Sequence, residues 1–263
     1  MKNILVTGAY GGMGAATVRV LRDRGYRVFA LDLRVGEAEQ NIIPIQADIT
    51  DESSIINAFN KVSEYTDSLY AIIHFAGIYM LDSLVEMDSS RFKNIFNINM
   101  CGAFSVNKAF IPLLKPGSRI IITTSELAPL DPLPFTGIYA VTKGALDKYA
   151  YSLRMELQLL DIPVSVLRAG AVNTGMLGVS TTALDRFCKE TKLYICNAKR
   201  FKSIVDMVEA RHISTDKLAK KVVKILEKRR PAFAYSINRN PLLLLMNLLP
   251  RRLQFWIIKL ILK

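Results

Sequence analysis

The stretch "ILVTGAYGGMGAATVRVL" (4–21) decides the fold, because an apolar run leads into a glycine-rich turn and then into an amphipathic segment. Gly8, Gly12 and Gly14 allow a tight turn, close approach of the backbone to a pyrophosphate, and close packing of helix on strand. The N-terminus of the helix adds free N–H groups and a partial positive charge for phosphate. In this strand–turn–helix context the pattern predicts a dinucleotide site.

Outward from this stretch, short β-branched runs alternate with amphipathic segments. Apolar strands separated by helices are typical of a parallel sheet covered on both faces. The sequence therefore predicts a doubly wound, three-layer α/β/α Rossmann fold in residues 1–240, followed by a short helical extension, 241–263. Strands are expected at 3–8, 27–32, 42–48, 70–77, 119–125, 163–170 and 231–236, and helices at 12–25, 52–65, 97–114 and 140–160.

Length and composition limit the classes of protein to which this chain can belong. With 263 residues, 51% of them hydrophobic, the chain is long enough for one large domain. We find no run of eighteen apolar residues and no leader pattern at the start, so no membrane span and a cytoplasmic location are expected. Three cysteines without metal-ligand spacing fit a reducing compartment, and with only two histidines no metal site is expected.

The net charge of +12 is unevenly distributed. Residues 1–185 carry 16 Lys and Arg against 18 Asp and Glu, whereas residues 186–263 carry 19 against 5. The basic excess of the last third is either a solvated face or a surface for an acidic partner, such as anionic lipid, nucleic acid or an acidic carrier protein.

Asp32 ends the second expected strand, where the family of dinucleotide folds carries an acidic residue. Its carboxylate could accept hydrogen bonds from both hydroxyls of the adenosine ribose and would repel a 2′-phosphate, which favours NAD over NADP. Arg34 is the complication, since its guanidinium could fold back over that ribose. Asp48 ends the third strand, where it either accepts from the adenine amino group or caps the next helix.

Tyr139 and Lys143 lie four residues apart at the start of a helix, and so on one face of it. A tyrosine is a poor base at neutral pH unless a cation lowers its pKa, and we expect Lys143 to do so. Ser125 follows the strand "RIIITT", where its hydroxyl could orient a carbonyl or an alcohol.

With these motifs in order, residues 3–240 resemble the short-chain dehydrogenases/reductases. The resemblance implies that Ser125, Tyr139 and Lys143 are catalytic and that Asn99 holds a water in a proton relay through Lys143. It also implies that Thr174 and the Val172 backbone hold the nicotinamide carboxamide. The motifs are "TGAYGGMG" (7–14), Asp32, "ADIT" (47–50), "NIN" (97–99), Ser125, Tyr139-x-x-x-Lys143 and "RAGAVNTGM" (168–176). The full set of expected cofactor contacts is Gly8, Gly12, Met13, Gly14, Asp32, Asp48, Ile49, Ala76, Gly77, Tyr139, Lys143, Val172 and Thr174.

Some positions depart from the family pattern. Phe75, in "HFAG" (74–77), replaces an asparagine that mainly ties neighbouring strands together, and Ala169 replaces a proline. Ser125 precedes Tyr139 by one residue more than is usual, which leaves Thr124 as a rival for the role of the serine.

The expected reaction is reversible hydride transfer between the cofactor and a secondary alcohol or ketone. The segment 175–214 is the expected substrate lid, and its apolar residues predict either an apolar pocket or simple packing of the lid on the core. The sequence is nearest in look to the hydroxysteroid and retinol dehydrogenases, which favours a lipophilic substrate. Alternatives are an NADPH-dependent 3-oxoacyl-acyl-carrier-protein-type reductase and a non-catalytic dinucleotide-binding regulator. The apolar lid residues are Met176, Leu177, Leu184, Phe187, Leu193, Tyr194, Ile195 and Phe201.

The tail "NPLLLLMNLLPRRLQFWIIKLILK" (240–263) is expected to form two short helices separated at Pro250, each too short to span a bilayer. Phe255 and Trp256 among leucines and isoleucines, with four basic residues, suit a peripheral contact with a membrane surface. The same leucines could instead close the substrate pocket or a subunit interface. No nucleic-acid partner is expected. By resemblance, helices 97–114 and 140–160 would pair with their copies in a homodimer or homotetramer.

Overall fold

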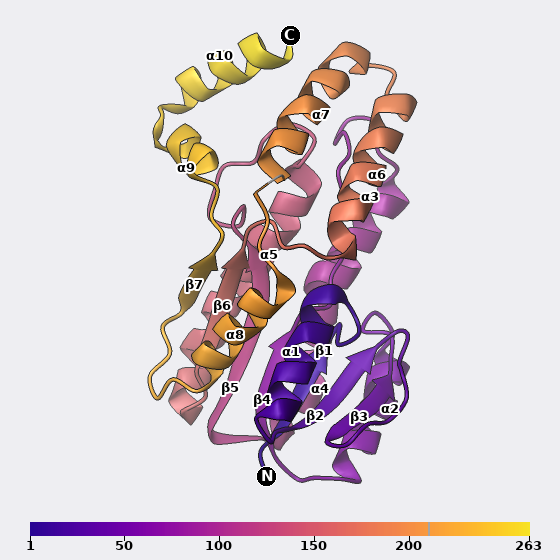
Figure 1. Ribbon diagram of the computed structural model, residues 1–263, viewed down its shortest axis with the longest axis vertical. Coiled ribbons are helices and arrows are strands. Elements are labelled where there is room, and N and C mark those ends of the chain that lie inside the picture. Colours follow the sequence, from indigo (N-terminus) through magenta and orange to yellow (C-terminus); the bar gives the residue numbers. More distant parts are fainter. Residues whose placement is uncertain (210) are drawn as a thin grey trace.

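The structure is a computed structural model that describes the backbone of residues 1–209 and 211–263, and the side chains except those of 176–181 and 206–210. Seven parallel strands form one sheet in the order β3-β2-β1-β4-β5-β6-β7 (Figure 1). This arrangement confirms the predicted doubly wound fold. The strands are β1 (Asn3–Thr7), β2 (Arg27–Asp32), β3 (Ile42–Gln46), β4 (Leu69–His74), β5 (Leu114–Ser125), β6 (Val164–Ala169) and β7 (Ala234–Ile237).

Helices cover both faces of the sheet (Figure 1). One face is covered by α1 (Gly12–Asp23) and α8 (Thr215–Leu226), which also contact each other. The other is covered by α2 (Glu52–Ser63), α4 (Gly102–Phe110) and α5 (Gly137–Leu157). The strand order reverses between β1 and β4, and in such folds ligands bind beyond the carboxyl ends of the strands at that point.

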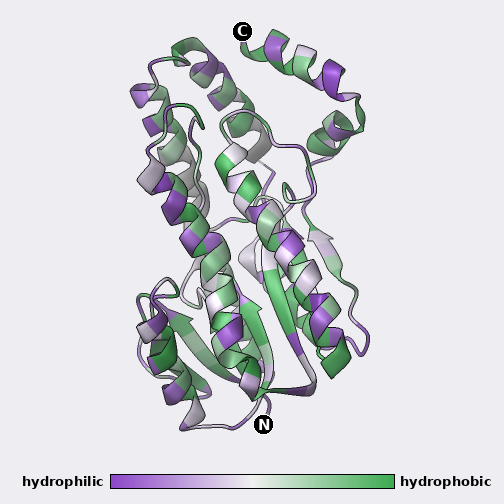
Figure 2. Ribbon diagram, turned by 180° about the vertical axis from the view of Figure 1, so that it is seen from behind, coloured by the Kyte–Doolittle hydropathy of each residue, from purple (hydrophilic) through white to green (hydrophobic). Residues whose placement is uncertain are grey.

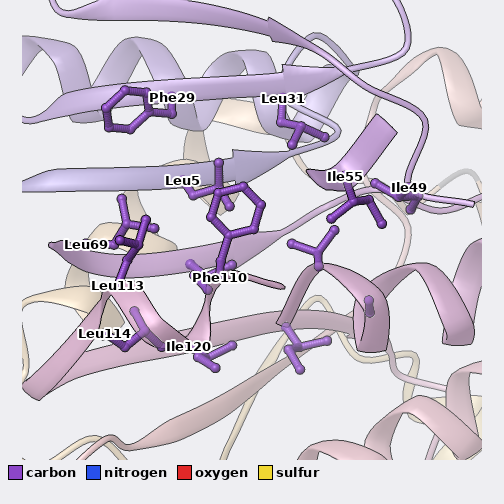
Figure 3. Packing of buried hydrophobic residues seen from close by; sticks show 14 of the residues in the cluster. Leu5, Phe29, Leu31, Ile49, Ile55, Leu69, Phe110, Leu113, Leu114 and Ile120 are labelled. Carbon is purple, nitrogen blue, oxygen red and sulfur yellow. The ribbon is translucent and has the colours of Figure 1, made fainter. Parts of the chain in front are cut away.

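Apolar strands give the sheet its rigidity. Leu5, Phe29 and Ile120 are fully buried on three strands, and Phe110 from α4 packs among them (Figure 3). Figure 2 shows the same pattern, with hydrophobic strands between helices of mixed character. Burying each such side chain stabilises the fold by about 1.5–3 kcal/mol. The strand ends that carry the site are therefore held by a close-packed core.

The helix expected at 97–114 begins earlier and is interrupted. It runs as α3 (Ser89–Phe96), a π-helical turn at Asn97–Cys101, and then α4. The polar segment "SSRFKN" has no apolar stripe that would announce a helix, and a π turn leaves no mark in sequence. π turns inside helices are frequent at functional sites, and this one carries Asn99.

The helices of the expected lid and of the tail lie beyond the carboxyl edge of the sheet (Figure 1). The expected lid consists of α6 (Gly175–Glu190) and α7 (Ile195–Glu209), and the tail forms α9 (Pro241–Leu248) and α10 (Arg251–Leu262), separated at Pro250 as expected. The side chains of Met176 and Leu177 lie outside those described. Among the described residues, no helix is long and apolar enough to cross a membrane.

Aromatic rings pack the lid against the loop before α5, and the tail joins the same cluster. The ring of Phe135 lies 4.6 Å from that of Phe187 and 5.4 Å from that of Phe201, between ring centroids. Leu262 of α10 is buried in the same cluster. Leu184 and Phe187 are thus packing residues of the lid, whereas Leu193 and Ile195 are exposed.

Candidate active site

A cavity of about 740 Å³ lies at the carboxyl ends of β1, β2 and β4, at the reversal of strand order. Most of the residues expected to bind a dinucleotide gather around it. These are Gly8, Gly12, Met13, Gly14, Asp32, Asp48, Ile49, Ala76, Gly77 and Thr174.

The glycine-rich turn needs its glycines for close contact. Gly8 has φ +65°, and a Cβ there would lie 2.6 Å from the nitrogen of Ala76. A Cβ on Gly14 would lie 1.9 Å from the carbonyl oxygen of Gly8. Because α1 begins at Gly12 without a side-chain cap, its first N–H groups are open to a ligand. The glycines thus allow the turn to pack closely against its neighbours, and the open N–H groups at the start of α1 fit the phosphates of a dinucleotide.

Backbone N–H groups hold the carboxylate of Asp32 at the cavity. Its Oδ2 accepts from the Tyr10 N–H at 2.9 Å, and its Oδ1 accepts from the Leu33 N–H at 2.8 Å. Each oxygen keeps a lone pair for a ribose hydroxyl. Arg34 lines the same cavity.

Asp48 is not the cap of the following helix. The N-cap of α2 is Asp51, whose side chain accepts from the Ser53 N–H. Asp48 instead accepts from the N–H and the hydroxyl of Thr50, at 2.8 and 2.7 Å, through Oδ1 alone. The capping alternative is therefore wrong, and the contact of Asp48 with adenine stays a prediction.

A second cavity, of about 190 Å³, lies against the first. The two share Met13, Gly77 and Thr174 in their walls. Ser125, Tyr139, Lys143 and Val172 line the smaller cavity. The expected catalytic side chains, except Asn99, thus lie at the wall of a pocket beside the dinucleotide cavity.

Ser125, at the end of β5, is the hydroxyl that faces Tyr139, on the first turn of α5, and the two side chains are hydrogen-bonded. The hydroxyl of Thr124 instead donates to Asp147 Oδ1 at 3.2 Å. Neighbouring strand residues point to opposite faces, which explains the difference. The geometry therefore favours Ser125 over its rival.

Burial controls the proton affinities of this site. It raises the pKa of Tyr139, as does the nearby Tyr79 phenol, while the hydrogen bond from Ser125 acts in the opposite direction. Burial also lowers the pKa of Lys143 to about 8. The Lys143 ammonium lies 5.8 Å from the centroid of the Tyr139 ring. Burial thus dominates the pKa of Tyr139 in this structure, and the lowering of that pKa by Lys143 stays a prediction.

Asn99 lies behind the cavities on the π turn and is 1% exposed. Its Oδ1 accepts from the Ile78 N–H at 2.8 Å, and its Nδ2 donates to the Ile78 carbonyl at 3.0 Å. A Cβ on Gly77 would lie 3.0 Å from Asn99 Oδ1 and 3.2 Å from Lys143 Nζ. Asn99 is therefore next to Lys143 and fixes the loop after β4. Its role in holding water stays a prediction.

Sequence reasoning missed several residues of the smaller cavity. Tyr79 comes from the loop after β4, whereas Glu126 and Leu133 come from the loop between β5 and α5, and no local pattern marks them as neighbours. The position of Glu126 directly after Ser125 was the one feature of the sequence that could have indicated its place in the site. Among the described residues, no group of three or more His, Cys, Asp or Glu side chains could hold a metal ion.

Comparison with known proteins agrees with this geometry. Estradiol 17-beta-dehydrogenase 2 of Mus musculus is 30% identical over 210 residues, which are 72% of this chain but 55% of that protein, so the chain spans about half of this relative. The 3-ketodihydrosphingosine reductase of Bacteroides thetaiotaomicron is 23% identical, over 89% of this chain and 87% of the reductase. A short chain dehydrogenase family protein of Francisella tularensis has a similar structure, with TM-score 0.75 and 22% identity over 90% of this chain and 97% of that one.

The sequence model of the short chain dehydrogenases matches residues 2–185, which is more than half of the chain. That region includes the glycine-rich turn, Ser125, Tyr139 and Lys143. The protein therefore belongs to the short-chain dehydrogenase family, whose members are oxidoreductases that use a nicotinamide nucleotide.

Proposed function

We propose that the protein is an NAD-dependent dehydrogenase that transfers hydride reversibly between the cofactor and a lipophilic secondary alcohol or ketone. The observation that carries this proposal is the hydrogen-bonded pair of Ser125 and Tyr139 in the wall of the smaller cavity. That cavity adjoins the dinucleotide cavity. A substrate oxygen beside this pair would thus lie within reach of a bound cofactor.

In the direction of oxidation, Tyr139 as phenolate accepts the hydroxyl proton while Ser125 donates a hydrogen bond to the same oxygen. The nicotinamide ring, when bound, supplies the carbon that accepts the hydride from the carbinol carbon. Because burial disfavours the phenolate, Tyr139 depends on nearby positive charge. Lys143 lies on the same face of α5, and with a pKa of about 8 it is mostly charged at neutral pH.

Asp32 supports NAD as the preferred cofactor. Its carboxylate is fixed at the cavity by two backbone N–H groups and would meet a 2′-phosphate with like charge. Arg34 is exposed beyond it and is the residue that could oppose this preference.

The lining of the smaller cavity supports a lipophilic substrate. Phe201, Ile204 and Val205 of α7 and Leu243 of α9 form part of its wall. Apolar walls with a few polar groups are typical of sites for small apolar ligands. The two relatives are named for estradiol and 3-ketodihydrosphingosine, and both names denote lipophilic molecules.

The proposal is tested by following nicotinamide absorbance with a panel of hydroxysteroids, retinol and long-chain secondary alcohols, each with NAD and with NADP. We expect turnover with one of these classes and a preference for NAD. Inactivity with the whole panel, together with NADPH-dependent reduction of an acetoacetyl thioester, would instead establish the acyl-thioester reductase alternative.

We also propose that residues 241–263 are an extension to a catalytic domain of residues 1–240, and that the extension contacts an anionic membrane surface. The inner side of α10 is buried through Gln254 and Leu262. Its outer side exposes Phe255 and Trp256, beside further exposed leucines of α9 and α10. With Arg252, Lys259 and Lys263 and no acidic residue in the extension, this surface complements anionic lipid. The other exposed apolar residues are Leu242, Leu245, Leu248, Leu253, Leu260 and Ile261.

The membrane contact is tested by sedimentation with phosphatidylglycerol vesicles. We expect the wild type to bind, salt to weaken binding, and the F255S/W256S variant to lose it. The I56S variant, which removes an exposed isoleucine of α2, is the matched control. Absence of wild-type binding, or equal binding by F255S/W256S, contradicts the proposal. A lower mass of F255S/W256S by light scattering would instead assign the surface to subunit contact.

We further propose that the protein forms a homodimer or homotetramer through α4 and α5. These helices expose Phe104, Val141, Tyr151 and Met155, which together would leave apolar surface in water. Light scattering of the wild type should give a multiple of 29.5 kDa, and F104S/Y151S should give a smaller species. A wild-type monomer would exclude this assembly.

A further inference from the structure

Glu126 is a buried carboxylate for which the proposed hydride transfer has no use. It directly follows Ser125, is 9% exposed, and lines the smaller cavity together with Ser125 and Tyr139. Among the described lining residues of that cavity, Glu126 is the one with an acidic side chain. A buried carboxylate is costly unless its oxygens are paired.

Among the described residues, one of the two carboxylate oxygens of Glu126 accepts a hydrogen bond. Oε2 accepts from the Asn240 N–H at 2.6 Å, at the start of α9. Within the described part of the chain, no hydrogen bond reaches Oε1. That oxygen lies by Gly170, another lining residue, where a Cβ would come within 2.9 Å of it. The main chain thus fixes the carboxylate and leaves one oxygen at the cavity wall.

The surroundings of Glu126 favour a positively charged ligand group. Burial raises the pKa of Glu126, while the Asn240 N–H and the charge of Arg239 lower it. A cation inside the cavity would compensate the remaining cost of the buried charge, and hydrogen bonds between ionised groups are stronger than neutral ones. Towards α7 and α9 the cavity wall becomes apolar, with Phe201, Val205 and Leu243.

We propose that Glu126 determines substrate specificity by binding an ammonium group close to the reacting carbon, so that the substrate is a lipophilic amino alcohol or the corresponding amino ketone. This inference rests on the proposed function and adds the substrate class. The reacting oxygen would lie at Ser125 and Tyr139, the ammonium group at Glu126, and the hydrocarbon part against α7 and α9.

The test compares three alcohols that differ in one group: 2-aminododecan-3-ol, dodecane-2,3-diol and dodecan-3-ol, each oxidised with NAD. For the wild type, kcat/KM for the amino alcohol should exceed that for dodecan-3-ol by roughly 10- to 100-fold, the effect of one charged hydrogen bond. E126Q keeps an oxygen for the Asn240 N–H but removes the charge. It should abolish the preference, so that the amino alcohol and dodecan-3-ol have similar kcat/KM values.

D131N is the matched control, because Asp131 is an acidic residue of the same loop that pairs with Arg251 and is not among the cavity residues. It should keep the preference for the amine. A wild type without that preference, a preference that survives in E126Q, or an equal preference for the diol overturns the inference. Calorimetric titration of 2-aminododecan-3-ol into both proteins measures the contact without turnover, and equal affinity for the wild type and E126Q also overturns it. Inactivity with all three alcohols despite tighter amine binding by the wild type refutes the proposed reaction and leaves the Glu126 site standing.

Discussion

Replacement of Asp32 by alanine should weaken NAD binding and abolish the preference for NAD over NADP. The carboxylate is held by the N–H groups of Tyr10 and Leu33, at 2.9 and 2.8 Å, so its two free lone pairs have fixed directions in the cavity. A hydrogen bond to a charged group contributes about 1.5–3 kcal/mol. Because Asp32 is half-buried, we assign the lower end of this range, about 1.5 kcal/mol, to each of its two hydrogen bonds with the ribose hydroxyls.

The two bonds together give about 3 kcal/mol, which corresponds to a roughly 100-fold rise in the Kd for NAD. The Kd for NADP should rise less, since removal of the carboxylate also removes its repulsion of the 2′-phosphate. D32N should fall between wild type and D32A, because an amide offers one acceptor oxygen instead of two.

Calorimetric titration of NAD and NADP into each variant measures these changes. The control is D23A, which removes an exposed carboxylate at the end of α1 and should leave both affinities unchanged. An unaltered NAD affinity in D32A, or tighter binding of NADP than of NAD by the wild type, would refute the assigned role of Asp32.

Two further predictions concern stability, measured by urea unfolding. Arg168 makes a bidentate ion pair with Asp147, whose side chain is 10% exposed. R168M should therefore lower the free energy of unfolding by about 3–5 kcal/mol, and R168M/D147L should regain most of that loss. A double variant no more stable than R168M would contradict this. Burial lowers the pKa of His74 from 6.5 to about 4, so the unfolded chain binds a proton in this range that the folded one does not. The free energy of unfolding of the wild type should therefore fall by about 3 kcal/mol as pH falls from 6.5 to 4, and that of H74Q should not. The same dependence of this free energy on pH in both proteins would contradict the assignment.

The sheet could be predicted from sequence because its central strands are short apolar runs that tertiary packing buries on both faces. Gly8 and Gly14 could be interpreted because their contacts are local and recur wherever a strand, a turn and a helix bind a dinucleotide. The division of the tail at Pro250 followed from the chemistry of proline alone.

Other features depend on tertiary contacts that no local pattern encodes. The pKa of Tyr139 is raised by burial that α5 acquires only when the chain folds. Which aspartate caps α2 also depended on the folded geometry, in which the side chain of Asp51 and not that of Asp48 accepts from the Ser53 N–H. Glu126 shares a wall with Leu243 because α9 returns over the carboxyl edge of the sheet.

The most direct test of the account is the turnover of Y139F with NAD and a lipophilic alcohol that the wild type oxidises. Y149F is the matched control, since it removes a partly buried tyrosine hydroxyl from the same helix at a position that is not among the residues of either cavity. We predict that Y139F loses at least about 100-fold in kcat, the usual contribution of general acid–base catalysis, and that NAD affinity is unchanged. Substantial turnover by Y139F would contradict the central claim that Tyr139 transfers the proton.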